Sequence, residues 1–278
     1  EKLGKKEEAE ADKKKAKELK RKKEPDGEYA VFAEYLSGNT KAAIEKYTKA
    51  IESDPKNALL YNKRGFVYND RGDFDEALND YNKAIELNPK DVESYNIRAS
   101  IYNYYKKDEE KALLDYDKVI EIDPKNIQAH EGRARIYYSG KKYDLALAEY
   151  EKLMELEPDK THHLFQRSMV YHELKEYDKA IADCNKLIQI EPKNSLYYRH
   201  RGNIYENKGD KDSALKDYNK VIELDPDDVH AYEYRGEIYK EQGENDKANA
   251  DFEKAKELKF GALKTKTDHL ELGDYYHS

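Results

Sequence analysis

The chain has 278 residues, of which 40% are Asp, Glu, Lys or Arg, and its formal net charge at pH 7 is −8. No apolar run approaches the roughly 18 residues of a membrane-spanning helix, and a single cysteine, Cys184, excludes an internal disulfide framework. The surplus of negative charge disfavours nucleic acid as a partner, because its phosphates would be repelled. A polar or basic protein partner suits this charge better.

The first 24 residues form a segment of their own, with eleven basic and seven acidic side chains. Such a composition cannot bury enough apolar area to fold alone, so residues 1–24 are predicted to be a solvated helix or a disordered arm. The arm carries +4, which leaves −12 on the rest of the chain. No secretory signal core is visible, which favours the cytoplasm, although the chain begins at Glu1 and processing of an upstream segment is compatible with this start.

From residue 25 onward the sequence repeats itself. Prolines recur at steps of 34 or 35 residues, at Pro55, Pro89, Pro124, Pro158, Pro192 and Pro226. A period of this length indicates one supersecondary unit copied many times, in which each copy buries its apolar face against its neighbours. We expect a repeat domain over 25–260, with a degenerate first copy at 25–56 and six regular copies at 57–260. Residues 261–278 are expected to cap the last copy or to trail from it.

Each copy is predicted to be a helix–turn–helix unit. Apolar residues follow three- and four-residue spacing in Ala58–Tyr68 and in Asp75–Leu87, which is the helical pattern. The Gly72-Asp73 pair between these segments marks a turn, and each proline ends the preceding second helix. The copies align without gaps apart from one extra residue near 106–110.

Small residues recur at fixed places in each copy. One column begins the second helices and consists of Ala43, Ala77, Ala112, Ala146, Ala180, Ala214 and Ala248. Another runs through the first helices and consists of Gly65, Ala99, Ala134, Ser168, Gly202 and Gly236. Small residues at a crossing allow two helices to approach closely. Tyrosine columns at helical spacing surround this contact and are expected to belong to the core rather than to a ligand site.

One copy contains, at regular spacing, Tyr61, Arg64, Gly65, Tyr68, Ala77, Tyr81 and Pro89. This series resembles the tetratricopeptide repeat, whose pattern is W-x₂-L-G-x₂-Y, then A-x₃-F, then P. The resemblance implies an all-α fold, namely a right-handed α-solenoid superhelix of about seven antiparallel helix–turn–helix repeats.

Arginine stands where the family pattern has leucine, at Arg64, Arg98, Arg133, Arg167, Arg201 and Arg235. A column of acids accompanies it in the second helices, at Asp80, Asp115, Glu149, Asp183, Asp217 and Asp251. An arginine in a packing position needs a carboxylate, because an unpaired buried charge is costly. We expect each arginine to pair with the acid of its own copy. The alternative pairing, with the acid of the preceding copy, would place Arg64 against Lys46 and leave Asp251 without an arginine. We interpret the column as structural rather than as a row of arginines that binds acidic ligands.

The resemblance also implies a partner site on the concave face, which the first helices line. The candidate groove residues vary from copy to copy and are Asn62, Phe66, Asn69, Asn96, Asn103, Arg135, Tyr138, Phe165, Met169, His172, Arg199 and Asn203. Phe165, Met169 and His172 form a candidate apolar anchor patch, with burial against a neighbouring copy as the alternative. The asparagines are candidates for binding a peptide backbone, or else they are solvated surface.

The predicted function is therefore a non-enzymatic scaffold or adaptor that binds a peptide or helix of a partner protein. No catalytic residue, metal site or cofactor is predicted, because no nucleophile and base can be assembled from neighbouring columns. His162-His163 lacks a second metal-spaced pair, and Cys184 occupies a core position.

Chaperone-binding members of the family hold a carboxylate with a clamp of Lys, Asn, Asn, Lys and Arg. That clamp is not found here, because Asn62 stands at the place of its first lysine. Two alternative functions stay open: a self-assembling structural subunit and an accessory subunit of a larger complex. The oligomeric state is not predicted.

Overall fold

The computed structural model describes residues 38–275, with side chains as far as Gly261. The arm predicted at 1–24 and the part of the first copy before residue 38 lie outside the described residues. The chain divides into two compact units, Glu1–Ile136 and Tyr137–Ser278. The sequence predicted one uninterrupted repeat domain over 25–260. The observed boundary falls inside a helix, between two residues of a first helix of a repeat.

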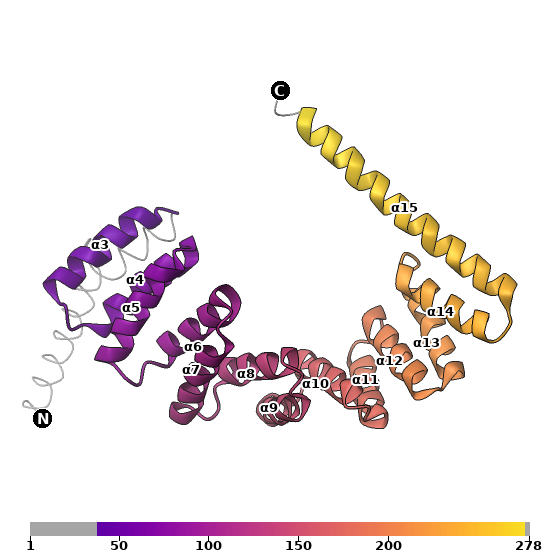
Figure 1. The fold of residues 1–278 in the computed structure, drawn as a ribbon, viewed down its shortest axis with the longest axis horizontal. Helices are drawn as coiled ribbons and strands as arrows, with labels where there is room; N and C mark the ends of the chain where they lie inside the picture. The colour runs from indigo at the N-terminus through magenta and orange to yellow at the C-terminus, as the bar shows by residue number, and fades with distance from the viewer. Residues whose placement is uncertain (1–37, 276–278) are drawn as a thin grey trace, which may run out of the picture. The chain divides into compact units, whose positions relative to one another are not determined.

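The described residues form helices joined by short turns, and Figure 1 follows them in colour from indigo to yellow. The first unit contains α3 (Thr40–Ser53), α4 (Ala58–Arg71), α5 (Phe74–Leu87), α6 (Val92–Ile101), a π-helical turn (Tyr102–Lys106), α7 (Glu109–Ile122) and the larger part of α8 (Ile127–Ser139). The second unit contains the end of α8, α9 (Tyr143–Leu156), α10 (Thr161–Glu173), α11 (Tyr177–Ile190), α12 (Ser195–Lys208), α13 (Lys211–Leu224), α14 (Val229–Glu241) and α15 (Asn245–Tyr275).

The helices pack as antiparallel pairs, which confirms the predicted all-α repeat architecture. The paired helices are α4 with α5, α6 with α7, α10 with α11, α12 with α13, and α14 with α15. Within a unit, each second helix also contacts the first helix of the next pair, as α5 contacts α6 and α11 contacts α12. The first helices α4, α6, α10, α12 and α14 are therefore each held between two second helices. No helix in the described part of the chain is long and apolar enough to cross a membrane.

The ends of the helices follow from local sequence. Asp91 caps α6 by accepting a hydrogen bond from the backbone N–H of Ser94, and Asp228 caps α14 in the same way from Ala231. The second helices end just before a proline, which has no amide hydrogen to continue the ladder. At the corresponding place α15 has Phe260, and this helix continues to Tyr275. The segment predicted to begin at 261 is thus helical as far as it is described.

The turn inside each pair depends on one residue in the left-handed region. It lies four residues after the last tyrosine of the first helix and is Gly72, Lys141, Lys175, Gly209 or Gly243 in the regular copies. Glycine adopts this conformation without a steric penalty, whereas in lysine the Cβ atom makes it unfavourable. The fold therefore imposes the turn even where the sequence does not favour it.

One copy accommodates its extra residue inside a helix rather than in a loop. Between Tyr102 and the left-handed Lys107 there are four residues instead of the usual three, and the backbone from Tyr102 to Lys106 forms a π-helical turn. A π turn changes the faces to which the last side chains of the helix point, and such turns are frequent at functional sites. This turn reshapes the surface next to α8.

The alanine column of the second helices lies in the core, and each alanine from Ala43 to Ala248 has an exposed fraction of 2% or less. The tyrosines that follow one turn later pack beneath the first helices. Tyr116 lies so close to Gly132 that a Cβ on this glycine would come within 2.3 Å of the tyrosine Cζ. A Cβ on Gly202 would likewise lie 2.7 Å from the Cε1 atom of Tyr218. Here the absence of a side chain creates room for an aromatic ring.

Candidate functional site

The arginine column forms ion pairs within the repeats. In each of five copies the arginine Nε and Nη2 donate to both carboxylate oxygens of the acid in the second helix of the same pair, at 2.6–2.8 Å. The pairs are Arg64–Asp80, Arg98–Asp115, Arg167–Asp183, Arg201–Asp217 and Arg235–Asp251. The sixth predicted pair, Arg133 with Glu149, joins residues of different units and stays a prediction.

In five of the six copies the arginine Nη1 donates to a further helix. Nη1 of Arg98 donates to Asn82 at 2.6 Å, and Nη1 of Arg133 donates to Asp117 at 2.7 Å. The same contact, always to the residue 16 places earlier, joins Arg64 to Thr48, Arg201 to Asn185 and Arg235 to Asn219. These five arginines therefore link their own repeat to the preceding one. Sequence analysis missed this polar column, although its constant offset of 16 residues was readable.

Tyrosine rings complete the surroundings of the guanidinium groups. The Arg235 guanidinium carbon lies 5.6 Å from the ring centre of Tyr232 and 5.9 Å from that of Tyr239, which adds cation–π attraction. The hydrogen bond that Arg235 donates to Asp251 raises the pKa of Arg235 above its usual value. Burial raises the pKa of Asp80, and the hydrogen bond from Arg64 opposes that change. The five paired arginines thus direct their charge at carboxylates inside the fold.

A second set of predicted groove residues also connects neighbouring repeats. Asn62 donates to the hydroxyl of Ser94 at 3.0 Å, Asn96 donates to Asn126 at 3.2 Å, and Arg199 donates to Asp228 at 2.5 Å. Each acceptor lies at the start of the next first helix, about 30 residues further on. Asn62 and Asn96 are buried, with exposed fractions of 1% and 6%. These three side chains thus stabilise the stacking of repeats.

The two buried asparagines keep one polar atom without a partner. Asn126 Oδ1 accepts from the backbone N–H of Ala129, and its amide nitrogen donates to Asp123, so its orientation is fixed. Asn96 must therefore direct its nitrogen at Asn126, which leaves Asn96 Oδ1 buried without a hydrogen bond. Asn62 Oδ1 is in the same situation. An unsatisfied buried acceptor costs roughly 1–3 kcal/mol, so a donor that reached it would be bound favourably.

The candidate apolar patch of the second unit is partly used for packing. Phe165 is half-buried, and its ring lies 5.7 Å from that of Tyr197 and 5.1 Å from that of His200, both in the next first helix. His172 accepts or donates a hydrogen bond with Asn207 at 2.8 Å. Asn203 Oδ1 lies 2.7 Å from the Tyr218 hydroxyl. Burial against a neighbouring repeat, the alternative for this patch, accounts for the Phe165 contacts.

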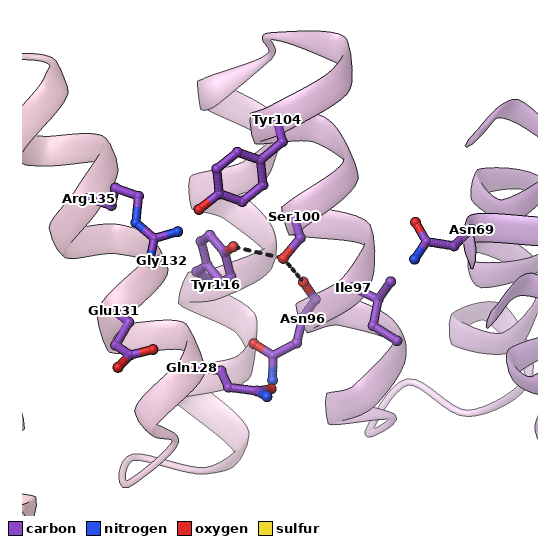
Figure 2. A pocket seen from close by; sticks show the side chains of 10 residues that line it. All are labelled: Asn69, Asn96, Ile97, Ser100, Tyr104, Tyr116, Gln128, Glu131, Gly132 and Arg135. Atoms are coloured by element: carbon purple, nitrogen blue, oxygen red, sulfur yellow. Dashed lines mark hydrogen bonds between the residues drawn. The ribbon is translucent and has the colours of Figure 1, made fainter. Parts of the chain in front are cut away.

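A hollow lies between the first helices α6 and α8 of the first unit. Its volume is about 350 Å³, and Figure 2 shows the side chains that surround it. The lining residues are Asn69, Asn96, Ile97, Ser100, Tyr104, Tyr116, Gln128, Glu131, Gly132 and Arg135. Three of them, Asn69, Asn96 and Arg135, are predicted groove residues. Gly132 allows the Tyr116 ring to reach the hollow, and the other copies have Lys63, Ile97, Gln166, His200 or Tyr234 at its place.

The π-helical turn determines which side chain covers one wall of this hollow. Sequence spacing placed Asn103 on the groove face, but the hollow is lined by Tyr104. The extra residue rotates the last turn of the first helix, so that Tyr104 points toward α8 (Figure 2). The Arg135 guanidinium carbon lies 5.6 Å from the centre of the Tyr104 ring. The neighbouring Tyr105 turns to the other side and stacks on Phe74, with ring centres 3.7 Å apart.

The floor of the hollow is a short chain of hydroxyl groups. Ser100 Oγ donates to the backbone carbonyl of Asn96 at 3.0 Å, and Tyr116 lies 3.2 Å from the same oxygen (Figure 2). Because Ser100 uses its hydrogen on the carbonyl, the Tyr116 hydroxyl donates to Ser100 and keeps its own oxygen as an acceptor. Burial raises the pKa of Tyr116 above the usual value, so this hydroxyl stays neutral. The hollow thus combines aromatic walls with hydrogen-bonding groups.

Nothing in the described residues favours redox or metal chemistry. Cys184 is buried, and burial raises the pKa of its thiol to about 12, so a reactive thiolate does not form at neutral pH. No group of three His, Cys, Asp or Glu side chains with metal-binding geometry occurs between residues 38 and 261. The arrangement is suited to binding.

Family comparison matches nearly the whole repeat region. Models described as tetratricopeptide repeat match residues 58–91 and, in four further copies, 92–126, 127–160, 164–194 and 229–261. A model described as TPR repeat matches 33–69 and 202–243. The chain belongs to the tetratricopeptide repeat family. Tetratricopeptide repeat proteins are protein–protein interaction scaffolds, and this general role applies to the chain.

Solved structures show the same fold. A tetratricopeptide repeat protein from Cytophaga hutchinsonii aligns with a TM-score of 0.71 at 20% identity, over 83% of this chain and 94% of that one. One from Parabacteroides merdae aligns at 0.59 and 25% identity, over 83% and 91%. YrrB, described as a TPR protein with an unusual peptide-binding site, aligns at 0.60 and 23% identity, over 66% and 95%. No curated protein sequence matches the chain.

Proposed function

We propose that this tetratricopeptide repeat chain is a non-enzymatic scaffold that binds a segment of a partner protein along the first helices of its first unit. The observation that carries the proposal is the hollow between α6 and α8, where polar and aromatic side chains surround an open volume of about 350 Å³. This volume lies at the small end of the range of ligand pockets and can hold one or two side chains of a peptide.

The distribution of contacts supports this choice of face. Asn62, Asn96 and Arg199 join neighbouring repeats through hydrogen bonds, whereas Asn69, Gln128 and Arg135 line the hollow. Solvated polar groups around a partly apolar floor are typical of a site that exchanges water for a peptide. The buried acceptor of Asn96 adds a place for a peptide N–H group.

The charge of the chain indicates the general chemistry of the partner. With a net charge of −8, the chain attracts polar or basic segments and repels strongly acidic ones. A peptide in extended form is favoured over a helix, because the hollow lies between two helices and admits single side chains. The partner's identity is a question for selection experiments.

Photo-crosslinking tests the proposal. A display library of random twelve-residue peptides is selected against the full chain, and the enriched peptides are crosslinked to variants with benzoyl-phenylalanine at Gln128 or at Leu114. Gln128 lines the hollow, whereas Leu114 is exposed on the second helix α7 and has 62% of its surface accessible. Crosslinks at Gln128 and not at Leu114 are expected. Crosslinks confined to Leu114, or a library without enrichment, would overturn the proposed function.

A further inference from the structure

We propose that the hollow beside the π-helical turn is a specificity pocket for one carboxylate side chain, Asp or Glu, of the bound peptide, with Arg135 as its partner. This inference rests on the proposed function and assigns the chemistry of one position in the ligand. The rest of the peptide is expected to be polar or basic, since the chain as a whole is acidic.

Arg135 differs from the other arginines of the described residues in its ion pairing. Every other arginine between residues 38 and 261 has a carboxylate within ion-pair distance, including the exposed Arg71, which pairs with Asp73. Arg135 has none in this described range. Its guanidinium instead lies against the Tyr104 ring, and its side chain is exposed to solvent. A positive charge is therefore available at the edge of the hollow.

The second step concerns how Tyr104 holds this charge. A guanidinium on an aromatic face is attracted by the ring and keeps its N–H donors, which lie in the plane of the group, for other partners. Those donors match the two oxygens of a carboxylate in a bidentate pair. Holding the arginine on a ring also reduces the conformational entropy that is lost when the ligand binds. The pair of Tyr104 and Arg135 is thus prepared to bind a planar anion.

The third step is that the π-helical turn creates this pair. Without the extra residue, the first helix would end as the others do, and the position after Asn103 would follow the pattern of Asp70 in the preceding copy. The insertion brings a tyrosine to one wall of the hollow, while Gly132 makes room for the Tyr116 ring whose hydroxyl belongs to the floor. Two independent departures from the repeat pattern, an insertion and a glycine, therefore meet at one site.

The fourth step defines the size and charge of the ligand group. Asn69 and Gln128 line the hollow with neutral amides, and Ile97 supplies an apolar surface for the methylene groups of the ligand. Glu131 also lines the hollow, and its negative charge disfavours a doubly charged phosphate. Arg135 and Glu131 together are neutral, so a bound carboxylate leaves one net negative charge in the hollow, whereas a doubly charged phosphate leaves two. The geometry thus favours Asp or Glu over a phosphorylated side chain.

The test uses peptides enriched from the random twelve-residue library on the full chain. Each peptide is resynthesised with its Asp or Glu changed to Asn or Gln, and again with phosphoserine at that place, and binding is measured by titration calorimetry. Replacing the peptide's Asp or Glu by its amide is expected to weaken binding to the wild-type chain about tenfold or more, because it removes a hydrogen bond between charged groups. The same change is expected to have no effect on the Arg135→Gln variant, which has already lost the partner.

Matched variants separate a binding role from a folding role. Arg71→Gln removes an exposed arginine outside the hollow and is expected to leave affinity unchanged. Deletion of Tyr104 restores the regular repeat length and is expected to reproduce the loss seen with Arg135→Gln, while Arg135→Lys keeps the charge and recovers only part of the affinity. Circular dichroism melts confirm that each variant is folded before it is titrated; because Arg135 is exposed, its substitutions are expected to keep the wild-type melting temperature.

The outcomes distinguish the two proposals. Peptides that crosslink at Gln128 but bind equally well without an acidic residue, or equally well to Arg135→Gln, would overturn the carboxylate pocket and leave the proposed function intact. Tighter binding of the phosphoserine peptide than of the glutamate peptide would overturn the assignment to Asp or Glu. Failure to enrich any peptide would overturn both.

Discussion

Arg98 joins three helices through one side chain. Its Nε and Nη2 donate to Asp115 at 2.8 and 2.6 Å in α7, and its Nη1 donates to Asn82 at 2.6 Å in α5. The carboxylate of Asp115 is almost fully buried, with 7% of its side-chain surface accessible. Such a pair need not add stability compared with apolar residues of the same size, but loss of one partner is costly because the other charge stays buried.

Replacement of this arginine should therefore reveal the cost of an uncompensated acid. Arg98→Ala is expected to lower the free energy of unfolding by about 3–5 kcal/mol, while Asn82→Ala, which removes only the link to the preceding repeat, is expected to cost about 0.5–1.5 kcal/mol. Urea titrations followed by circular dichroism measure both. A double-mutant cycle with Asp115→Ala should show positive coupling between Arg98 and Asp115. An Arg98→Ala loss below 1 kcal/mol would mean that Asp115 is solvated after all.

The glycine on the wall of the hollow gives a second prediction. A Cβ at Gly132 would come within 2.3 Å of Tyr116 Cζ, so Gly132→Ala forces the ring to move and is expected to destabilise the chain by about 1–3 kcal/mol. In a Tyr116→Ala background the ring is absent, and the added methyl group should then cost little or should stabilise α8 through its helix propensity. Thermal unfolding of the four variants tests this. Equal penalties in both backgrounds would contradict the packing argument.

The left-handed turns give a third prediction, with controls inside the same chain. Lys175 has φ of 60°, whereas Gly209 occupies the same place in the next repeat with φ of 89°. Lys175→Gly removes the steric strain at the Cβ but increases the conformational entropy of the unfolded chain, so we expect a net gain in stability of about 0.5–1 kcal/mol. Gly209→Ala is expected to cost about 1 kcal/mol in the opposite direction. Melting temperatures that move in the same direction for both variants would show that the backbone conformation is not the cause.

The sequence alone predicts those features that recur at a constant spacing along the chain. Three features are local patterns that recur at the same spacing: the ends of helices before Pro89 or Pro226, the turn at Gly72, and the alanine column. A prediction made for one copy is therefore supported by the next copy. The arginine and acid columns are predictable for the same reason. In each copy the acid follows the arginine at a nearly constant spacing, as Asp115 follows Arg98. These features follow from spacing alone.

The candidate site was less predictable, because it depends on where neighbouring repeats meet. Helical spacing placed Asn62, Asn96 and Arg199 on the groove face, but it does not say that the start of the next first helix reaches the same side chains. The extra residue near 106–110 was visible, yet a longer loop and a π-helical turn are both compatible with one insertion. Only the coordinates show that it brings Tyr104 rather than Asn103 to the hollow.

A histidine in the second unit should make stability depend on pH. His200 lies under Phe165, its Nε2 is 3.0 Å from Ser168 Oγ, and its ring lies 5.8 Å from that of His172. Ser168 donates its own hydrogen to the Phe165 carbonyl, so the neutral His200 donates from Nε2. Burial, with a smaller contribution from His172, lowers the pKa of His200 from 6.5 to about 4. The folded chain thus holds this imidazole in its uncharged form.

The sign of the effect follows from proton binding. Between pH 6.5 and about 4 the unfolded chain takes up a proton at this position and the folded chain does not, so stability is fully present above pH 6.5 and is lost as the pH falls. The loss by pH 4.5 is expected to be about 2–3 kcal/mol. Urea titrations from pH 7 to 4.5 should show a flatter profile for His200→Gln, since glutamine occupies this place as Gln166 in the preceding repeat. His172, whose pKa burial also lowers, will leave a residual slope, whereas profiles of identical steepness would exclude His200 as the source.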